Sequence, residues 1–91
     1  MKRKLHLYLL DDQFESVLHG ERTLSRPRSE YYTNLMTFEK NGVRLIKRFD
    51  VAVLHNGKRE NHKSIHIELV GISEDDSSFT ISLGDIVKFV W

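Results

Sequence analysis

Two Asn-Gly pairs constrain the possible folds of this chain more than any other feature of its sequence. Asn41-Gly42 and Asn56-Gly57 both follow segments rich in β-branched and aromatic residues. Asparagine and glycine tolerate the positive φ angles of a type I′ turn, so each pair is a strong hairpin signal. The first pair predicts a long hairpin formed by residues 31–39 and 43–54. The second pair precedes a polar stretch and predicts a longer loop before a strand at 64–72.

The N-terminal segment predicts a strand followed by a helix. Leucines alternate with polar residues over residues 5–9, which is the period of a strand with one buried face. Asp12 can cap a helix, and Glu15 three places later completes a capping-box pattern. Gly20 readily takes the left-handed conformation that often ends a helix. We therefore expect a short helix at 12–19 that docks on a sheet, because so short a helix is not stable alone.

The C-terminal segment predicts two further strands. Residues 74–78 are typical of a turn, and residues 79–83 alternate between apolar and polar side chains. Gly84-Asp85 predicts a break, after which a strand resumes at 86–91. The whole chain then has six or seven strands and one helix. This pattern predicts an α+β fold, a small and mostly antiparallel β-barrel with one short helix after the first strand.

Length and composition limit the classes of protein that this chain can belong to. The chain has 91 residues and no cysteine. Its length favours a single domain, residues 1–91, with one modest core. The lack of cysteine excludes disulfides and thiolate zinc sites. No apolar run approaches the roughly 18 residues that cross a bilayer, so we expect a cytoplasmic protein that needs no membrane and no cofactor.

Charge is distributed unevenly along the sequence. Residues 40–63 carry seven positive side chains against two negative ones, whereas residues 64–91 carry one positive against five negative. The basic middle segment includes the polar loop from Lys58 to Lys63. Such a distribution can direct a polyanion to one face, although a solvated hairpin has the same composition.

Residues 7–24 resemble the opening of the ASCH superfamily, whose barrels are similar to the PUA domains that bind RNA. In that family a first strand leads into a helix with a Phe-x-x-Val/Ile-x-x-Gly pattern, followed by Gly-x-Lys-Thr. Phe14, Val17 and Gly20 match the helix pattern, and Thr23 matches the threonine. The resemblance implies a PUA-like barrel and contact with RNA.

Three positions depart from the family pattern. Arg22 replaces the usual lysine, Ser25 stands where glutamate is common, and Pro27 stands where arginine is expected. One branch of the family hydrolyses an acylated cytidine nucleoside, and the resemblance would transfer its catalytic pair to Arg22 and Ser25. An arginine stays protonated at ordinary pH and cannot act as a general base. We therefore expect binding and not catalysis, with an ASCH-type hydrolase or ribonuclease as an alternative.

Arginines, lysines and tyrosines form the predicted binding site. Guanidinium and ammonium groups can contact phosphate oxygens, and a tyrosine ring can stack on an unpaired base. The predicted nucleic-acid-binding residues are Arg22, Arg26, Arg28, Tyr31, Tyr32, Lys47, Arg48, Lys58 and Arg59. We expect the partner to be RNA in preference to DNA. The simpler interpretation is that the arginines keep a strand edge soluble and that one tyrosine belongs to the core.

Histidines raise two further hypotheses. His62 and His66 have no third ligand with a clear position, so no metal site is expected. His66 and Glu68 are two residues apart on a predicted strand and should project from one side. With Ser25 they are the weak catalytic candidates, since a histidine beside a carboxylate can activate an RNA 2′-hydroxyl. A solvent-exposed sheet face explains the same pattern without any catalysis.

The C-terminal residues support a hypothesis of another class. Val87, Phe89 and Trp91 either join the core or form an exposed apolar strand. Exposed apolar patches on small proteins usually mark interfaces. The chain would then be a homodimer or a compact viral or accessory regulator that binds and inhibits a host protein.

Overall fold

The structure of the chain is a computed structural model that describes residues 3–57 and 63–91. The predicted contact residues Lys58 and Arg59 lie outside the described residues, as does His62. The elements follow in the order β1 (Lys4–Leu9), α1 (Asp11–Leu18), β2 (Thr23–Pro27), α2 (Glu30–Met36), β3 (Thr37–Lys40), β4 (Val43–Ile46), β5 (Val51–Asn56), β6 (Ser64–Glu74) and β7 (Ser78–Val90).

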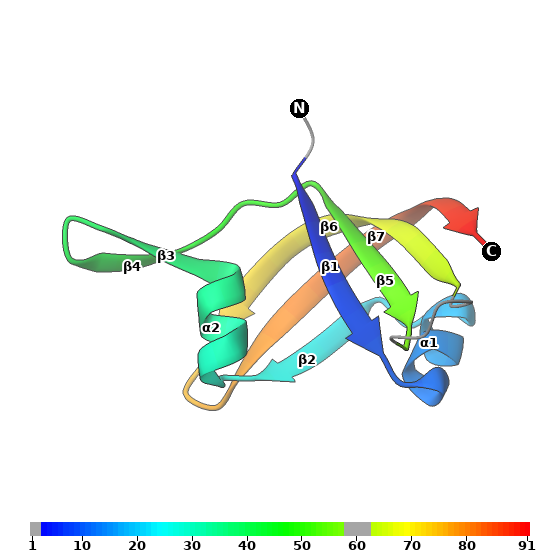
Figure 1. Cartoon of the computed structure of the whole chain (residues 1–91), viewed down its shortest axis with the longest axis horizontal. Coiled ribbons are helices and arrows are strands. Elements are labelled where there is room, and N and C mark those ends of the chain that lie inside the picture. The colour runs from blue at the N-terminus through cyan, green and yellow to red at the C-terminus, as the bar shows by residue number, and fades with distance from the viewer. Residues whose placement is uncertain (1–2, 58–62) are drawn as a thin grey trace.

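Five of the strands form one curled sheet with the shape of a half-barrel (Figure 1). The strand order is β1-β5-β6-β7-β2, with β1 parallel to β5 and the other pairs antiparallel. Strands β3 and β4 pair only with each other in the described chain and project from the body as a separate hairpin (Figure 1). The prediction of a small, mostly antiparallel α+β fold is confirmed, but the described sheet is a half-barrel, and the described residues form two helices instead of one.

The core lies on the inner face of this sheet. Leu5, Leu7 and Leu9 of β1 are fully buried there, as the alternation predicted. Helix α1 contributes Phe14 and Val17 to the same cluster. A buried leucine or phenylalanine side chain stabilises a fold by about 1.5–3 kcal/mol. This face therefore provides most of the driving force for folding.

Helix α1 begins one residue earlier than the sequence predicted. Its N-cap is Leu10, whose backbone N–H donates to Oε1 of Gln13. The predicted capping box of Asp12 with Glu15 is therefore wrong, because both residues already lie inside the helix. The predicted left-handed residue is confirmed, since Gly20 has a φ of 115°.

Helix α2 replaces most of a predicted strand. Residues 31–36 were expected to be extended because they include two tyrosines and a threonine, but they are helical. The side chain of Ser29 accepts a hydrogen bond from the backbone N–H of Tyr32 at 3.2 Å and caps the helix. Met36 at the other end is fully buried in the core. Capping and tertiary packing thus outweigh the strand preference of the aromatic residues.

The hairpin at Asn41-Gly42 is confirmed but is short. Asn41 and Gly42 have φ angles of 54° and 78°, as a type I′ turn requires. The flanking strands have only four residues each. Residues 51–54 belong to β5 in the main sheet, so the predicted long hairpin is wrong at its outer end.

Strand β7 runs through the break that was predicted at Gly84-Asp85. Its pairing with β6 shifts register between Ile67 and Leu69. At this irregularity, the backbone N–H of Asp85 donates to Oε1 of Glu68 at 3.0 Å. The glycine therefore marks a bulge and not the end of a strand. No helix within the described ranges is both long and apolar enough to cross a membrane.

Candidate nucleic-acid interface

The outer face of the sheet carries aromatic and basic side chains. Strand β1 exposes Lys4, His6 and Tyr8 on this face because its leucines point inward. The strand register continues this face across the sheet. His6 lies opposite Val53 of β5, Val53 lies opposite His66 of β6, and His66 lies opposite Lys88 of β7. One row of side chains thus crosses four strands.

Three rings stack along the β1–β5 pair. His55 lies between His6 and Tyr8, with ring centroids 5.2 Å and 4.9 Å from theirs. Nδ1 of His6 and Nε2 of His55 are 2.9 Å apart, so an N–H of one ring donates to the other. The parallel pairing of β1 with β5 creates this stack, because it places His55 beside Tyr8.

A cavity of about 360 Å³ lies beside the stack, at the edge of the sheet. It is lined by His6, Leu7 and Tyr8 of β1 and by Tyr31 and Tyr32 of α2. The two tyrosine rings meet edge to face with centroids 5.0 Å apart. Tyr31 is 60% exposed, whereas Tyr32 is half-buried against the core. This aromatic pocket has π surfaces on which a flat ring can rest.

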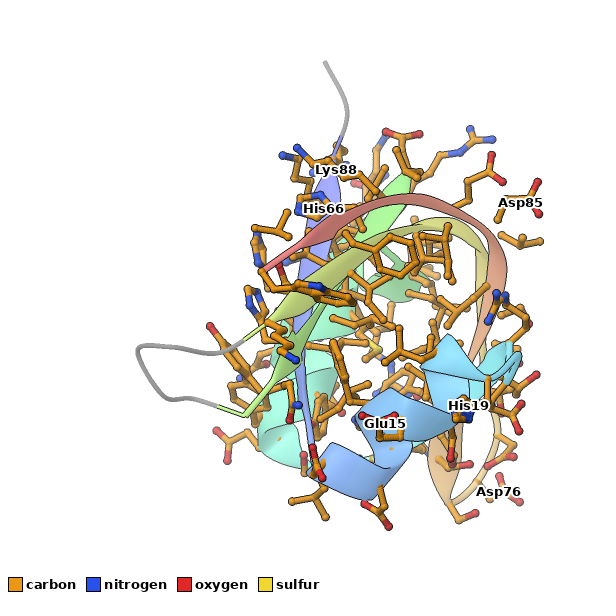
Figure 2. The ribbon with its side chains drawn as sticks, turned by 90° about the vertical axis from the view of Figure 1, so that its right-hand side faces the viewer. Glu15, His19, His66, Asp76, Asp85 and Lys88 are labelled. Carbon is orange, nitrogen blue, oxygen red and sulfur yellow. The ribbon has the colours of Figure 1, made fainter. Side chains whose placement is uncertain are left out.

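The electrostatic environment of His66 is positive. Partial burial and the neighbouring charges of Lys88, Lys4 and His6 lower the pKa of His66 below its ordinary value of 6.5. Figure 2 shows His66 and Lys88 together at the top of the molecule, while Asp85 lies away from them at the right. Burial, the larger cause of this shift, attracts no anion, but the positive charges of Lys88 and Lys4 do.

Each of the three predicted arginines is held by contacts in a different place, so they do not form one binding surface. Arg22 is half-buried, and its Nη1 donates to the carbonyls of Val17 and Glu21 at the end of α1. Arg28 forms an ion pair with Glu74 at 2.9 Å. Arg26 is buried and points to the inner side of the sheet.

The two other predicted contact residues that the structure describes, Lys47 and Arg48, lie in another part of the molecule. Lys47 and Arg48 line a groove of about 630 Å³ between the β4–β5 connection and β6. Asp50 and Glu68 line the same groove, so its charge is mixed. The aromatic pocket and this groove share no residue. Of the predicted site, only Tyr31 and Tyr32 lie at the aromatic pocket.

The weak catalytic candidates are only partly brought together. His66 and Glu68 project from the same face of β6, as the alternation predicted, and Ile65 and Ile67 on the other face are buried. Ser25 lies on β2 and pairs with Thr80, away from the part of β7 that pairs with His66. Among the residues that the structure describes, no group of three His, Cys, Asp or Glu side chains could hold a metal ion.

Sequence reasoning missed four residues of the outer face. Lys4, His6, Tyr8 and Lys88 were not among the predicted contacts. The alternation of β1 already indicated that the first three share a solvent-facing side. Their proximity to α2 and β6 depends on the sheet order, which the sequence did not reveal.

The C-terminal strand is exposed and apolar. Val87, Phe89 and Trp91 are 52%, 51% and 64% exposed. Phe89 and Trp91 contact each other, with ring centroids 5.1 Å apart, and Trp91 also meets Phe14 edge to face at 6.4 Å. These residues form a continuous patch, here called the C-terminal patch, beside α1.

Comparison with known proteins gives no matching family model, no matching curated protein and no matching solved structure. The resemblance to the ASCH superfamily therefore stays a prediction.

Proposed function

We propose that this chain binds single-stranded nucleic acid, RNA in preference to DNA, on the outer face of its sheet. One observation carries the proposal: an aromatic pocket adjoins a row in which His6, His66 and Lys88 flank the buried Val53, with Glu68 as the carboxylate beside His66 on the same face. Stacking of an unpaired base on an aromatic ring contributes about 1–3 kcal/mol and depends little on sequence. The base would enter the pocket of Tyr8, Tyr31 and Tyr32, and phosphates would follow the row toward Lys88.

The dimensions support this arrangement. His6 and Lys88 are separated by three strand spacings, which amounts to about 14 Å at roughly 4.8 Å per spacing. A short stretch of extended polynucleotide covers that distance. The preference for RNA rests on the PUA-like resemblance and on the tyrosine hydroxyls, which can hydrogen-bond a 2′-hydroxyl.

The test uses fluorescence anisotropy with a labelled single-stranded RNA oligonucleotide and a DNA oligonucleotide of the same sequence. Tyr31→Ala removes the most exposed ring of the pocket and is expected to weaken RNA binding about 5- to 150-fold, the equivalent of 1–3 kcal/mol. Phe38→Ala is the matched control, because Phe38 is an exposed aromatic residue of the projecting hairpin. Equal affinities of the Tyr31 and Phe38 variants would refute the proposed interface.

The C-terminal patch favours a second candidate function. Three neighbouring apolar side chains are half-exposed or more, which is unusual for a small monomer and typical of an interface. In this alternative the chain is a compact regulator that binds a protein, or pairs with a second copy, through β7. Sedimentation of the pure protein tests the second copy. Phe89→Ser would then abolish a dimer, while Tyr31→Ala would not.

A further inference from the structure

Arg26 occupies an unusual place for a charged residue. It alternates with Ser25 on β2 and shares the inner direction of Leu24, so only 7% of its surface is exposed. Its Nη1 donates to the carbonyl of Ser25 at 2.7 Å. Its Nε is buried and has no hydrogen-bond partner.

The charge of Arg26 has no counter-ion in the part of the chain that the structure describes. The ion pairs found there join Glu74 to Arg28 and to Arg44. An arginine cannot release its proton to avoid the cost of burial, unlike a lysine. A buried and unpaired cation destabilises the folded state. An anion that reaches this guanidinium would recover much of that cost.

A small cavity borders Arg26. It has a volume of about 240 Å³ and lies between α1 and β2. All of its lining residues except Leu24 are of polar type, and the lining consists of Gln13, Ser16, Glu21, Thr23, Leu24, Ser25 and Arg26.

The lining also includes a neutral hydrogen-bond donor, the amide nitrogen of Gln13. Gln13 uses its Oε1 to accept the N–H of Leu10, which leaves its amide nitrogen as a donor. Thr23 and Ser25 also line the cavity, but their side chains leave β2 on the face opposite to that of Arg26. Glu21 is the one acidic residue of the lining, and its Oε1 accepts the backbone N–H groups of Arg22 and Thr23, both at 3.1 Å. Its carboxylate is thus held by the backbone instead of by Arg26.

We propose that Arg26, together with the amide nitrogen of Gln13, binds a small oxyanion, namely a phosphate group. Arginine presents its donors in a planar fork that matches two phosphate oxygens, and the amide nitrogen of Gln13 is a neutral donor for a third. The volume of the cavity fits a phosphate ion or the terminal phosphate of a nucleotide. This site lies between α1 and β2 and shares no residue with the aromatic pocket at the edge of the sheet.

The experiment titrates the full chain with inorganic phosphate and, separately, with uridine 5′-monophosphate. The first readout is the Nε–H resonance of Arg26 in a ¹⁵N NMR spectrum, which is expected to shift and saturate. The second is thermal unfolding, where a hundredfold excess over Kd is expected to raise Tm by about 10 °C or more. Competition between the probes distinguishes the two sources: displacement of inorganic phosphate by the nucleotide identifies a nucleotide site, and its absence identifies a site for the free ion.

Variants locate the effect. Arg26→Met keeps the length of the side chain without its charge and is expected to abolish the phosphate-dependent rise in Tm. Arg28→Met is the matched control and should keep it. Glu21→Gln removes the acidic side chain from the lining and should tighten phosphate binding.

Two results would overturn the proposal. One is an unchanged Arg26 resonance in the wild type at saturating phosphate, which counts even if the Arg26 variant fails to fold. The other is a rise in Tm for Arg26→Met equal to that of the wild type. Tyr31→Ala should leave phosphate binding intact, which separates this site from the RNA interface.

Discussion

The two faces of the half-barrel differ although the same strands build them. On β1, the inner side consists of three buried leucines and the outer side of a lysine, a histidine and a tyrosine. On β6, Ile65 and Ile67 point inward, while His66 and Glu68 point outward. Adjacent residues therefore serve different purposes, because side chains of a strand alternate between its faces. Stability and binding should respond to different variants that are only one residue apart.

The largest effect is expected on the inner face. Phe79 of β7 is fully buried in the core, so Phe79→Ala should lower the free energy of unfolding by about 3–5 kcal/mol. Urea denaturation measures this loss. A loss below about 1 kcal/mol would mean that the core is not organised as described.

The second largest effect is expected on the outer face, where a substitution should weaken RNA binding and leave stability unchanged. Tyr8 lies on the outer side of β1 and lines the aromatic pocket. Tyr8→Ala should weaken RNA binding about 5- to 150-fold, the equivalent of 1–3 kcal/mol. Phe38→Ala is a close control, since Tyr8 and Phe38 are both 42% exposed. If Tyr8→Ala unfolds the protein instead, the division of roles between the two faces is wrong.

A smaller effect is expected for the charge at the far end of the basic row. Lys88→Ala should reduce the slope of log Kobs against log salt by about 0.7, which corresponds to one phosphate contact on a single strand. Lys40→Ala at the hairpin should leave the slope unchanged, because Lys40 lies at the end of β3. Anisotropy titrations at several salt concentrations distinguish these outcomes. Identical slopes for the two variants would remove Lys88 from the interface.

The smallest effect concerns the protonation of His66. Its pKa is lowered in the folded protein, mainly by burial and then by Lys88, Lys4 and His6. The unfolded chain therefore binds more protons than the folded one just below the ordinary pKa of 6.5, and stability falls as the pH decreases through that window. His66→Gln should remove this part of the pH dependence.

Lys88 provides an independent check of the same electrostatic environment. Lys88→Ala should raise the pKa of His66 toward its ordinary value, because one of the positive charges that lower it is removed. NMR titration of the histidine ring protons measures the change. A pKa that stays the same or falls would show that the outer row is not assembled across β6 and β7.

Local features of the fold were predictable wherever the signal was short-range. The alternation of β1, the left-handed Gly20 and the type I′ turn at Asn41-Gly42 follow from the steric properties of a few adjacent residues. Helix α2 was not predicted. Its tyrosines favour strands, and only the cap at Ser29 and the burial of Met36 make the helical form stable.

The candidate site was predictable only in part. Tyr31 and Tyr32 were expected to provide a stacking surface, and both line the aromatic pocket. The arginines were expected beside them, but Arg22 and Arg28 form contacts with α1 and with Glu74. Charge along a sequence indicates which residues are basic, whereas the pairing of strands decides which of them are adjacent.

By itself, the sequence determined the alternation of β1, the tight turns and the absence of any disulfide. These depend on residue type and spacing, which act over a few bonds. Only the tertiary structure decided that β1 pairs in parallel with β5, that Arg26 is buried, and that His6 lies in line with Lys88. The reason is that strand order and register depend on contacts between residues far apart in the chain, and the burial of the whole core selects among them.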